Sequence, residues 1–291
     1  MRGEAQQNTD THFDKLSELK RFHHSSYILN LRNRSMTHSS IHCHEKPKAL
    51  MCWSGGKDSA MALYKAQQNF EVVTLLTTLN AEFGRISMHG VREELLDAQA
   101  NAIGLPLIKV WVRAGSNEEY EQQMTDGLEK AKAQGVTHVI FGDIFLQDLR
   151  EYRERQLAKV GLTAVFPLWH SNTADLIQTF VAQGFSTMTC CINDGYLDQS
   201  WAGREINSSF IAELPAHVDP CGENGEYHTF CFAGPIYRQP IQVTLGEVIY
   251  RPLPTPMPIS TQPDNQDEDQ YVCKSVVETK GFWFCDLVAV A

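Results

Sequence analysis

Short apolar runs alternate with amphipathic stretches from about residue 46 to residue 161. The apolar runs at residues 49–53, 72–79, 107–112 and 137–141 predict strands, and the stretches at 59–68, 91–103, 118–134 and 147–160 predict helices. Gly104, Gly135 and Gly161 follow three of these stretches, where glycine commonly ends a helix. This alternation predicts an α/β fold with a doubly wound, mostly parallel sheet, whose ligands bind at the carboxyl ends of the strands.

The rhythm changes after Pro167. We expect a helix over residues 174–183, a strand over 186–191, a helix over 204–214, and antiparallel hairpin strands within 236–250 and 271–290. A proline-rich, acidic stretch between those hairpin segments predicts a linker or surface loop. The pattern divides the chain into a nucleotide domain at 46–167 and a smaller α+β substrate-binding domain at 168–291.

Residues 1–45 are polar, lack helix or strand periodicity, and hold six of the eleven histidines. We interpret them as a solvated extension rather than a metal-binding tract. Met36 lies a short distance before the first predicted strand, so we hypothesise that translation starts there. The intact mass of the native protein tests this hypothesis.

A glycine-rich turn, Ser54-Gly55-Gly56-Lys57-Asp58-Ser59, connects the first predicted strand to the first helix. The glycines allow a sharp turn, and the amide N–H groups of the turn, the helix N-terminus and Lys57 together favour an anion. The Walker pattern Gly-x-x-x-x-Gly-Lys-Ser/Thr is absent, so this is not the P-loop of those ATPases. The turn predicts a site for the pyrophosphate part of a nucleotide.

Charge limits the choice of partners. The chain has 291 residues and a formal net charge of −10, and from Trp169 onward it carries 5 Lys and Arg against 15 Asp and Glu. Such a surface disfavours extended nucleic-acid binding, which needs clustered positive charge. The absence of a long apolar run, a signal peptide or a Cys-x-x-Cys pair predicts a soluble, cytoplasmic protein with free thiols, without membrane or zinc binding.

Two further segments narrow the family. Gly142-Asp143-Ile144 precedes residues 150–155 (Arg-Glu-Tyr-Arg-Glu-Arg), and residues 221–230 read Cys-Gly-Glu-Asn-Gly-Glu-Tyr-His-Thr-Phe. Together with the Ser54–Ser59 turn, they resemble the diphthine–ammonia ligase family of PP-loop N-type ATP pyrophosphatases. The resemblance covers nearly all of residues 46–290. It implies a PP-loop (HUP-like) fold that uses ATP and Mg²⁺, adenylates a carboxylate, transfers ammonia to it, and releases AMP and pyrophosphate.

The resemblance also implies site residues. We expect the catalytic residues to be Lys57, Asp58, Glu223 and Glu226, and ATP to be bound by Ser54, Gly55, Gly56, Lys57, Asp58, Ser59, Gly142, Asp143 and Arg150. Asp58 and Asp143 are the expected Mg²⁺ ligands, with capping of the following helix as the alternative for Asp143. Glu154, Tyr227, Thr229 and His89 are the expected substrate contacts, with His228 a weaker one. For Glu223 and Glu226 the alternative is a solvated loop, and for Glu151 and Arg155 we expect only a surface ion pair.

The sequence does not identify the acceptor substrate. The chain lacks the additional C-terminal domains of long eukaryotic members, and its ending at residues 281–287 looks more like bacterial members; bacteria make no diphthamide. The acceptor carboxylate is therefore either protein-bound or a small molecule, and free ammonia is expected because no glutamine amidotransferase domain is visible. A PP-loop tRNA-modifying enzyme and a non-catalytic ATP sensor are the alternatives. The sequence leaves the oligomeric state open, a homo-oligomer included.

Overall fold

The structure, a computed structural model, describes residues 45–86, 89–113, 117–253 and 278–290. The expectations for the N-terminal extension, the start at Met36 and the acidic linker lie outside the described residues.

Among the described residues, the first sheet has six strands. β1 (Lys48–Cys52), β2 (Glu71–Asn80), β4 (Leu107–Val112), β5 (His138–Ile140) and β6 (Thr163–Val165) pair in parallel, and the short β3 (Arg85–Ile86) pairs antiparallel with β2. The strand order is β3-β2-β1-β5-β6, with β4 also on β2. The predicted mostly parallel α/β sheet is confirmed.

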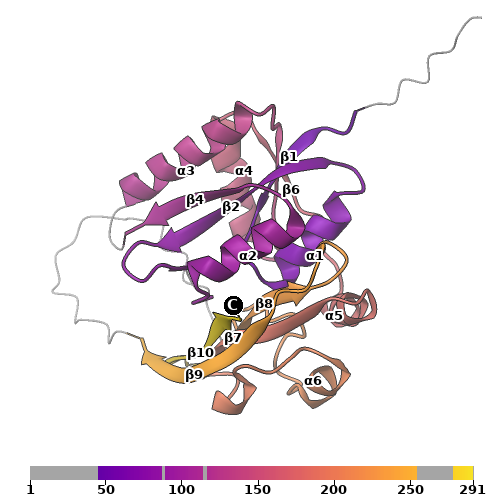
Figure 1. Cartoon of the computed structure of the whole chain (residues 1–291), viewed down its shortest axis with the longest axis vertical. Helices are drawn as coiled ribbons and strands as arrows, with labels where there is room; N and C mark the ends of the chain where they lie inside the picture. Colours follow the sequence, from indigo (N-terminus) through magenta and orange to yellow (C-terminus); the bar gives the residue numbers. More distant parts are fainter. Residues whose placement is uncertain (1–44, 87–88, 114–116, 254–277, 291) are drawn as a thin grey trace, which may run out of the picture. The chain divides into compact units, whose positions relative to one another are not determined.

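Helices cover both faces of this sheet (Figure 1). α1 (Lys57–Ala66) and α2 (Glu93–Ile103) lie on one face, and α3 (Asn117–Lys132) and α4 (Gln147–Lys159) on the other. Successive side chains of a strand point to opposite faces. In β1, accordingly, Met51 packs in the core with α1 and α2, while its neighbour Leu50 packs in the core with α3 and α4. Such two-sided burial explains why these strands are nearly continuous apolar runs.

A second, antiparallel sheet follows. β7 (Ser186–Asn193), β8 (Tyr227–Ala233), β9 (Val243–Pro252) and β10 (Gly281–Ala289) are arranged in the order β8-β7-β10-β9. α5 (Thr173–Ala182), a 3₁₀ turn at Gln199–Trp201 and α6 (Ser208–Glu213) complete this part of the chain. The expected hairpin is formed by β9 and β10.

Four elements differ from the sequence-based expectation. The short strands β3 and β6 were not predicted, and residues 227–233 form β8 although 221–230 looked like a turn-rich loop. The helix expected from residue 204 begins only at Ser208. Residues 204–206 instead hydrogen-bond along β7, where Thr189 N–H donates to the Arg204 carbonyl and Ile206 N–H donates to the Thr187 carbonyl, each at 2.9 Å.

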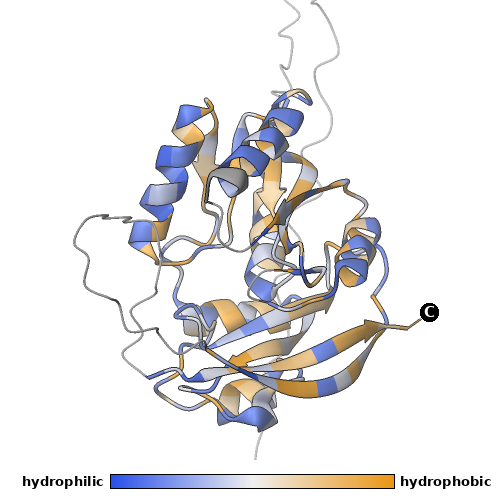
Figure 2. Cartoon of the chain, turned by 90° about the vertical axis from the view of Figure 1, so that its left-hand side faces the viewer, coloured by the Kyte–Doolittle hydropathy of each residue, from blue (hydrophilic) through white to orange (hydrophobic). Residues whose placement is uncertain are grey.

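The second sheet shares the core of α1 and α2. Phe230 of β8 and Ile192 of β7 belong to the same buried cluster as Leu63 of α1. Hydrophobic residues follow the strands, while hydrophilic residues line the outer faces of the helices (Figure 2). No helix among the described residues is both long enough and apolar enough to cross a bilayer. The shared core brings β8 against the turn that follows β1, where Cys231 N–H donates to the Gly55 carbonyl at 2.8 Å.

Candidate active site

The turn Ser54–Ser59, which we call the nucleotide loop, leaves β1 and enters α1 at the carboxyl edge of the parallel strands. Gly55 has a φ of 78°, a left-handed conformation that glycine adopts without steric cost. Ser59 Oγ donates to the Gly56 carbonyl at 2.9 Å and lies 3.2 Å from Ser54 Oγ, which braces the loop. The first N–H groups of a helix have no acceptor within the helix, so this junction is suited to an anion.

Gln99 of α2 fixes the loop from behind, and the sequence reasoning missed it. Its side chain is fully buried; Nε2 donates to the Gly55 carbonyl at 2.9 Å and to the Cys231 carbonyl at 2.6 Å. Its Oε1 accepts a hydrogen bond from Trp53 Nε1 at 2.9 Å. A glutamine on the apolar face of an amphipathic helix is the signal that could have pointed to it, because a buried amide needs partners.

The Lys57 ammonium lies at the centre of the site. Its side chain is only 4% exposed, and Nζ donates to Asp58 Oδ2 at 2.7 Å and to the Cys221 carbonyl. The Tyr227 ring centroid lies 5.2 Å away, in cation–π range. Burial alone would lower the pKa of Lys57, but the carboxylate of Asp58, with Tyr227 and Cys221 beside it, raises the pKa above its usual value. The lysine therefore stays charged.

β8 touches the same helix N-terminus. Lys57 N–H donates to Thr229 Oγ1 at 2.9 Å, a contact between residues 172 positions apart. A Cβ on Gly56 would lie 3.1 Å from both the carbonyl oxygen and Oγ1 of Thr229, so this glycine permits the close approach. Tyr227 O–H donates to the Pro220 carbonyl at 2.5 Å. Thr229 and Tyr227 thus both lie at the nucleotide loop.

The segment after β5 reaches the loop from the other side. A Cβ on Gly142 would lie 3.0 Å from the carbonyl carbon of Asp58 and from Ser59 N. Glu223 Oε1 accepts from Ile144 N–H at 2.7 Å and from Phe145 N–H at 3.4 Å. All three sequence motifs therefore meet at the N-terminus of α1.

Carboxyl groups crowd this meeting point. Burial raises the pKa of Asp58, with the charges of Asp219 and Asp143 adding to it, against the lowering effect of Lys57. Burial, followed by the charge of Asp58, raises the pKa of Glu223 to about 8, although the bond from Ile144 N–H opposes this. Each of these buried carboxyl groups therefore disfavours the ionised form of its neighbours.

Asp143 pairs with an arginine of α4. Arg153 Nε lies 2.7 Å from Asp143 Oδ2, and the Arg153 guanidinium lies 4.4 Å from the Phe141 ring centroid. The N-cap of α4 is Leu146, without a side-chain cap, so the alternative that Asp143 caps the helix is wrong. Arg153 had no role in the sequence reasoning; its place in the motif at 150–155 was the available signal.

Glu226 holds its own loop together. Its side chain is fully buried. One oxygen accepts from Asp219 N–H at 2.9 Å and from Asn224 Nδ2 at 3.0 Å, and the other accepts from Asn224 N–H at 2.9 Å. The solvated-loop alternative is therefore wrong for Glu226. These bonds hold residues 219–226 together, and the catalytic role expected for Glu226 stays a prediction.

Two histidines lie beside the loop. The His89 and His228 ring centroids are 4.7 Å apart, and His89 Nδ1 lies 3.2 Å from the Thr229 carbonyl oxygen, to which it donates. A Cβ on Gly56 would lie 3.1 Å from His89 Cε1. Burial lowers the pKa of His89 to about 4 and that of His228 well below its usual value, so both rings are neutral near pH 7.

The remaining expected residues lie on α4. Arg150 Nε donates to Glu154 Oε1 at 2.8 Å, and the Arg150 guanidinium lies 4.6 Å from the Trp169 ring centroid. Glu151 accepts from Gln147 Nε2 rather than pairing with Arg155. Within α4, Arg153 is the residue that pairs with the carboxylate cluster.

The carboxyl cluster suits a divalent cation shared with phosphate. No group of three or more His, Cys, Asp or Glu side chains among the described residues is arranged to hold a metal. Mg²⁺ in nucleotide sites commonly uses one or two carboxylates, with phosphates and waters as its other ligands. Asp58 and Asp143, whose charges both raise the pKa of Glu223, are carboxylates of this kind.

Comparisons with known proteins agree with this arrangement. The family description "Diphthamide synthase N-terminal domain" matches residues 47–164, and "Diphthamide synthase C-terminal domain" matches residues 172–252. The diphthine–ammonia ligase of Danio rerio is 24% identical over an alignment of 221 residues, which covers 67% of this chain and 86% of that protein. The Homo sapiens protein of the same name is 23% identical over an alignment of 220 residues, which covers 67% of this chain and 82% of that protein.

A longer relative matches this chain over only part of its own length. The diphthine–ammonia ligase of Schizosaccharomyces pombe is 24% identical over an alignment of 223 residues, which covers 69% of this chain but 37% of that protein. Since the two vertebrate proteins are covered over most of their length, a short chain is not confined to bacterial members. With matches to both domains, this chain belongs to the diphthamide synthase family, in which its named relatives are diphthine–ammonia ligases.

Proposed function

We propose that this chain is an ATP-dependent ligase that adenylates a carboxylate and transfers ammonia to it, releasing AMP and pyrophosphate. One observation carries the proposal: a buried, charged Lys57 ammonium lies at the N-terminus of α1, where the nucleotide loop, the segment after β5 and residues 219–229 meet. The diphthine–ammonia ligase names of the relatives support the same activity.

The loop's part in the reaction is electrostatic. The first-turn amides of α1 and Lys57 contact the β- and γ-phosphates, and they stabilise the charge that develops as the bond to the α-phosphorus breaks. Removing one donor aimed at such charge typically costs about 2.7–4 kcal/mol. Asp58 and Asp143 would hold Mg²⁺, which would supply further neutralisation of the phosphate charge. Asp58 now pairs with Lys57 Nζ at 2.7 Å, so nucleotide binding exchanges this partner for phosphate.

The proposed chemistry has two steps. A carboxylate oxygen attacks the α-phosphorus and pyrophosphate leaves, which gives a mixed anhydride of the acid with AMP. Ammonia then attacks the acyl carbon, AMP leaves with the electrons of the C–O bond, and the nitrogen loses one proton as the amide forms. Glu223, with a pKa raised to about 8, exchanges protons near neutral pH and is our candidate to position ammonia and take this proton.

The acceptor is a diphthine-like carboxylate, either protein-bound or a small molecule, and the nitrogen comes from free ammonia. Tyr227, Thr229 and His89 line the loop on the side of β8, and we propose that they face the bound substrates. Arg150 and Glu154 pair with each other on α4, so we propose no more than a peripheral contact for them.

The test is a product analysis of a Lys57→Met variant. Purified protein, ATP, Mg²⁺, ammonium and diphthine-bearing elongation factor 2 are incubated, and nucleotides are separated by chromatography. We expect AMP and pyrophosphate from the native chain and from Lys65→Met, a control in the same helix, and none from Lys57→Met with unchanged circular dichroism. Formation of ADP and phosphate contradicts the proposal, and ATP binding without either product supports the sensor alternative.

A further inference from the structure

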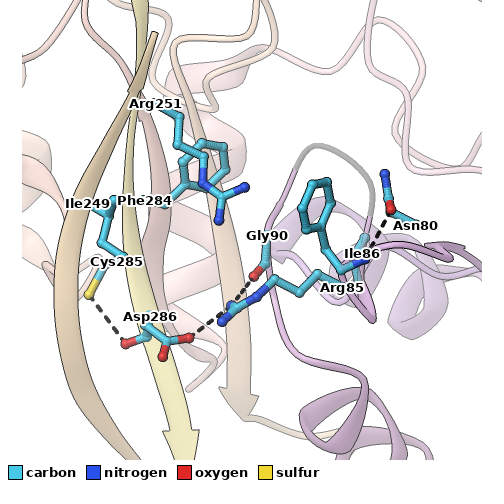
Figure 3. A pocket seen from close by; sticks show the side chains of 10 residues that line it. Asn80, Arg85, Ile86, Gly90, Ile249, Arg251, Phe284, Cys285 and Asp286 are labelled. Carbon is cyan, nitrogen blue, oxygen red and sulfur yellow. Dashed lines mark hydrogen bonds and ion pairs between the residues drawn. The ribbon is translucent and has the colours of Figure 1, made fainter. Parts of the chain in front are cut away.

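A pocket of about 160 Å³ lies between the β2–β3 connection and the β9–β10 hairpin (Figure 3). Phe83 and Arg85 line it from the first side, and Arg251, Phe284 and Asp286 from the second. Ile249 of β9 pairs with Phe284 of β10, and Arg251 pairs with Phe282 two residues along, so the Arg251 and Phe284 side chains share one face of the hairpin.

The acidic side chain of the pocket is already neutralised. Asp286 accepts from Arg85 Nη1 at 2.9 Å and from Arg92 Nε and Nη2 at 3.0 and 2.6 Å. The bond from Arg92 is the largest cause that holds the pKa of Asp286 down at about 2. Arg85 also donates to the Gly90 carbonyl at 2.7 Å. Figure 3 shows Arg85 pointing to Asp286 and Gly90, so its charge is committed within the protein.

Arg251, unlike Arg85, keeps its charge free of an ion pair with the described residues. Its guanidinium lies 5.4 Å from the Phe83 ring centroid and 5.7 Å from the Phe284 ring centroid, and it pairs with no carboxylate of the described residues. It is also one of only 5 Lys and Arg against 15 Asp and Glu from Trp169 onward. A cation held over two aromatic rings, in an otherwise acidic part of the chain, offers a ligand one ion pair and an apolar wall.

The pocket is close to the nucleotide loop. Gly90 lines the pocket, and a Cβ there would lie 2.7 Å from the Phe284 ring. The preceding residue, His89, lies against Gly56, with its Cε1 3.1 Å from where a Cβ would be. Consecutive Cα atoms are about 3.8 Å apart, and the residue that contacts the loop and the residue that lines the pocket are direct neighbours in the chain.

We propose that this pocket is the acceptor subsite, in which Arg251 pairs with the carboxylate-bearing arm of the acceptor and the Phe83 and Phe284 rings pack against its apolar part. This inference rests on the proposed ligase function. Pockets that enclose a drug-sized ligand usually measure about 300–1,000 Å³, so a pocket of about 160 Å³ suits one arm of a ligand rather than a whole nucleotide.

The experiment measures binding rather than turnover, so it can fail independently of the ligase proposal. Phenylacetate is titrated by calorimetry into the full chain with Mg²⁺ and saturating α,β-methylene ATP, which keeps the fragment off the nucleotide loop. Phenylacetamide, which has the same ring without the charge, is the matched neutral probe. We expect phenylacetate to bind roughly fivefold or more tightly than phenylacetamide, because the pair with Arg251 is charge-assisted but partly exposed.

Arg251→Gln abolishes that preference, and Phe83→Ala weakens both probes. Both positions are exposed, and Phe83 is 57% exposed, so neither substitution removes core packing. Arg155→Gln, at an exposed arginine of α4, keeps the native preference. The proposal is overturned if phenylacetate shows no preference over phenylacetamide, if the preference survives in Arg251→Gln, or if Arg251→Gln weakens α,β-methylene ATP binding as much as phenylacetate binding.

Discussion

Replacing Gln99 by methionine tests whether the nucleotide loop is held from behind by one buried amide. Methionine has nearly the same length and keeps the space between α2, the loop and β8 filled. It cannot donate to Gly55 or Cys231, and it offers no good acceptor to Trp53. The substitution therefore removes three short hydrogen bonds, of 2.9, 2.6 and 2.9 Å, and a long one of 3.5 Å to the Tyr237 hydroxyl, while leaving the packing nearly intact.

The loss of the Gln99 amide affects the partners of its three short hydrogen bonds to different extents. The Gly55 carbonyl keeps its bond from Cys231 N–H at 2.8 Å, and the Cys231 carbonyl keeps its bond from Tyr237 O–H at 3.0 Å. Trp53, only 2% exposed, has its Nε1–H left without an acceptor. An orphaned buried donor costs about 1–3 kcal/mol and a lost bond about 0.5–1.5 kcal/mol net, so we expect a loss of about 2–4 kcal/mol.

Urea denaturation measures this loss, and a double-mutant cycle locates its cause. Trp53→Phe removes the donor that Gln99→Met leaves orphaned, so Gln99→Met should cost at least about 1 kcal/mol less in that background. We also expect the affinity for ATP to fall, because the Gly55 carbonyl loses one of the two N–H donors that hold it. A cost below about 1 kcal/mol, or the same cost in both backgrounds, refutes the assigned role of Gln99.

Three further predictions concern the site and its supports. The pKa of Glu223 is raised from 4.5 to about 8 in the folded chain, so the free energy of unfolding without nucleotide falls as pH rises through that range, by at most about 5 kcal/mol. In Glu223→Gln, the stability measured by urea denaturation should depend less on pH between pH 5 and 8. The pKa of Asp286 is lowered from 3.8 to about 2, so the stability that its carboxylate contributes is present above pH 3.8 and is lost as pH falls through 2. In urea denaturation, Asp286→Asn should therefore cost about 1–2 kcal/mol at pH 7 and little at pH 2. Gly142→Ala places a Cβ 3.0 Å from Ser59 N and should weaken ATP binding about tenfold in calorimetry, without loss of helix by circular dichroism. An unchanged pH profile for Glu223→Gln, an equal cost of Asp286→Asn at both pH values, or native ATP affinity in Gly142→Ala contradicts the respective prediction.

Local signals predicted most elements of the first sheet and the helices that cover it. Residues 107–112 were expected as a strand and form β4, and the glycine stop at Gly104 is a left-handed C-cap with φ of 81°. These predictions succeeded because an amphipathic period of about 3.6 or a buried apolar run reports which side of a segment faces the core. The nucleotide loop was visible for the same reason, since its glycines, lysine and hydroxyls act within six consecutive residues.

Strand β8 is an element that these local sequence signals did not predict. Its residues 227–230 follow a run of glycines and glutamates, and the turn chemistry hid the strand. The pairing with β7, and the bond from Lys57 N–H to Thr229 Oγ1, depend on partners far away in the chain. The burial of Glu226 was hidden for the same reason, because only the folded loop shows that its carboxylate accepts hydrogen bonds from Asp219 and Asn224.

The amino-acid sequence alone determined the doubly wound sheet, the position of the nucleotide loop in it, and the motifs of the family. Tertiary structure decided which groups meet around that loop. Gln99 lies behind it, Glu223 bonds to the segment after β5, Arg153 pairs with Asp143, and Arg251 lines a neighbouring pocket. The physical reason is that local periodicity records only burial against exposure. The pKa values and partners of buried polar groups depend on which distant segments share their low-dielectric surroundings, and that is settled when the chain packs.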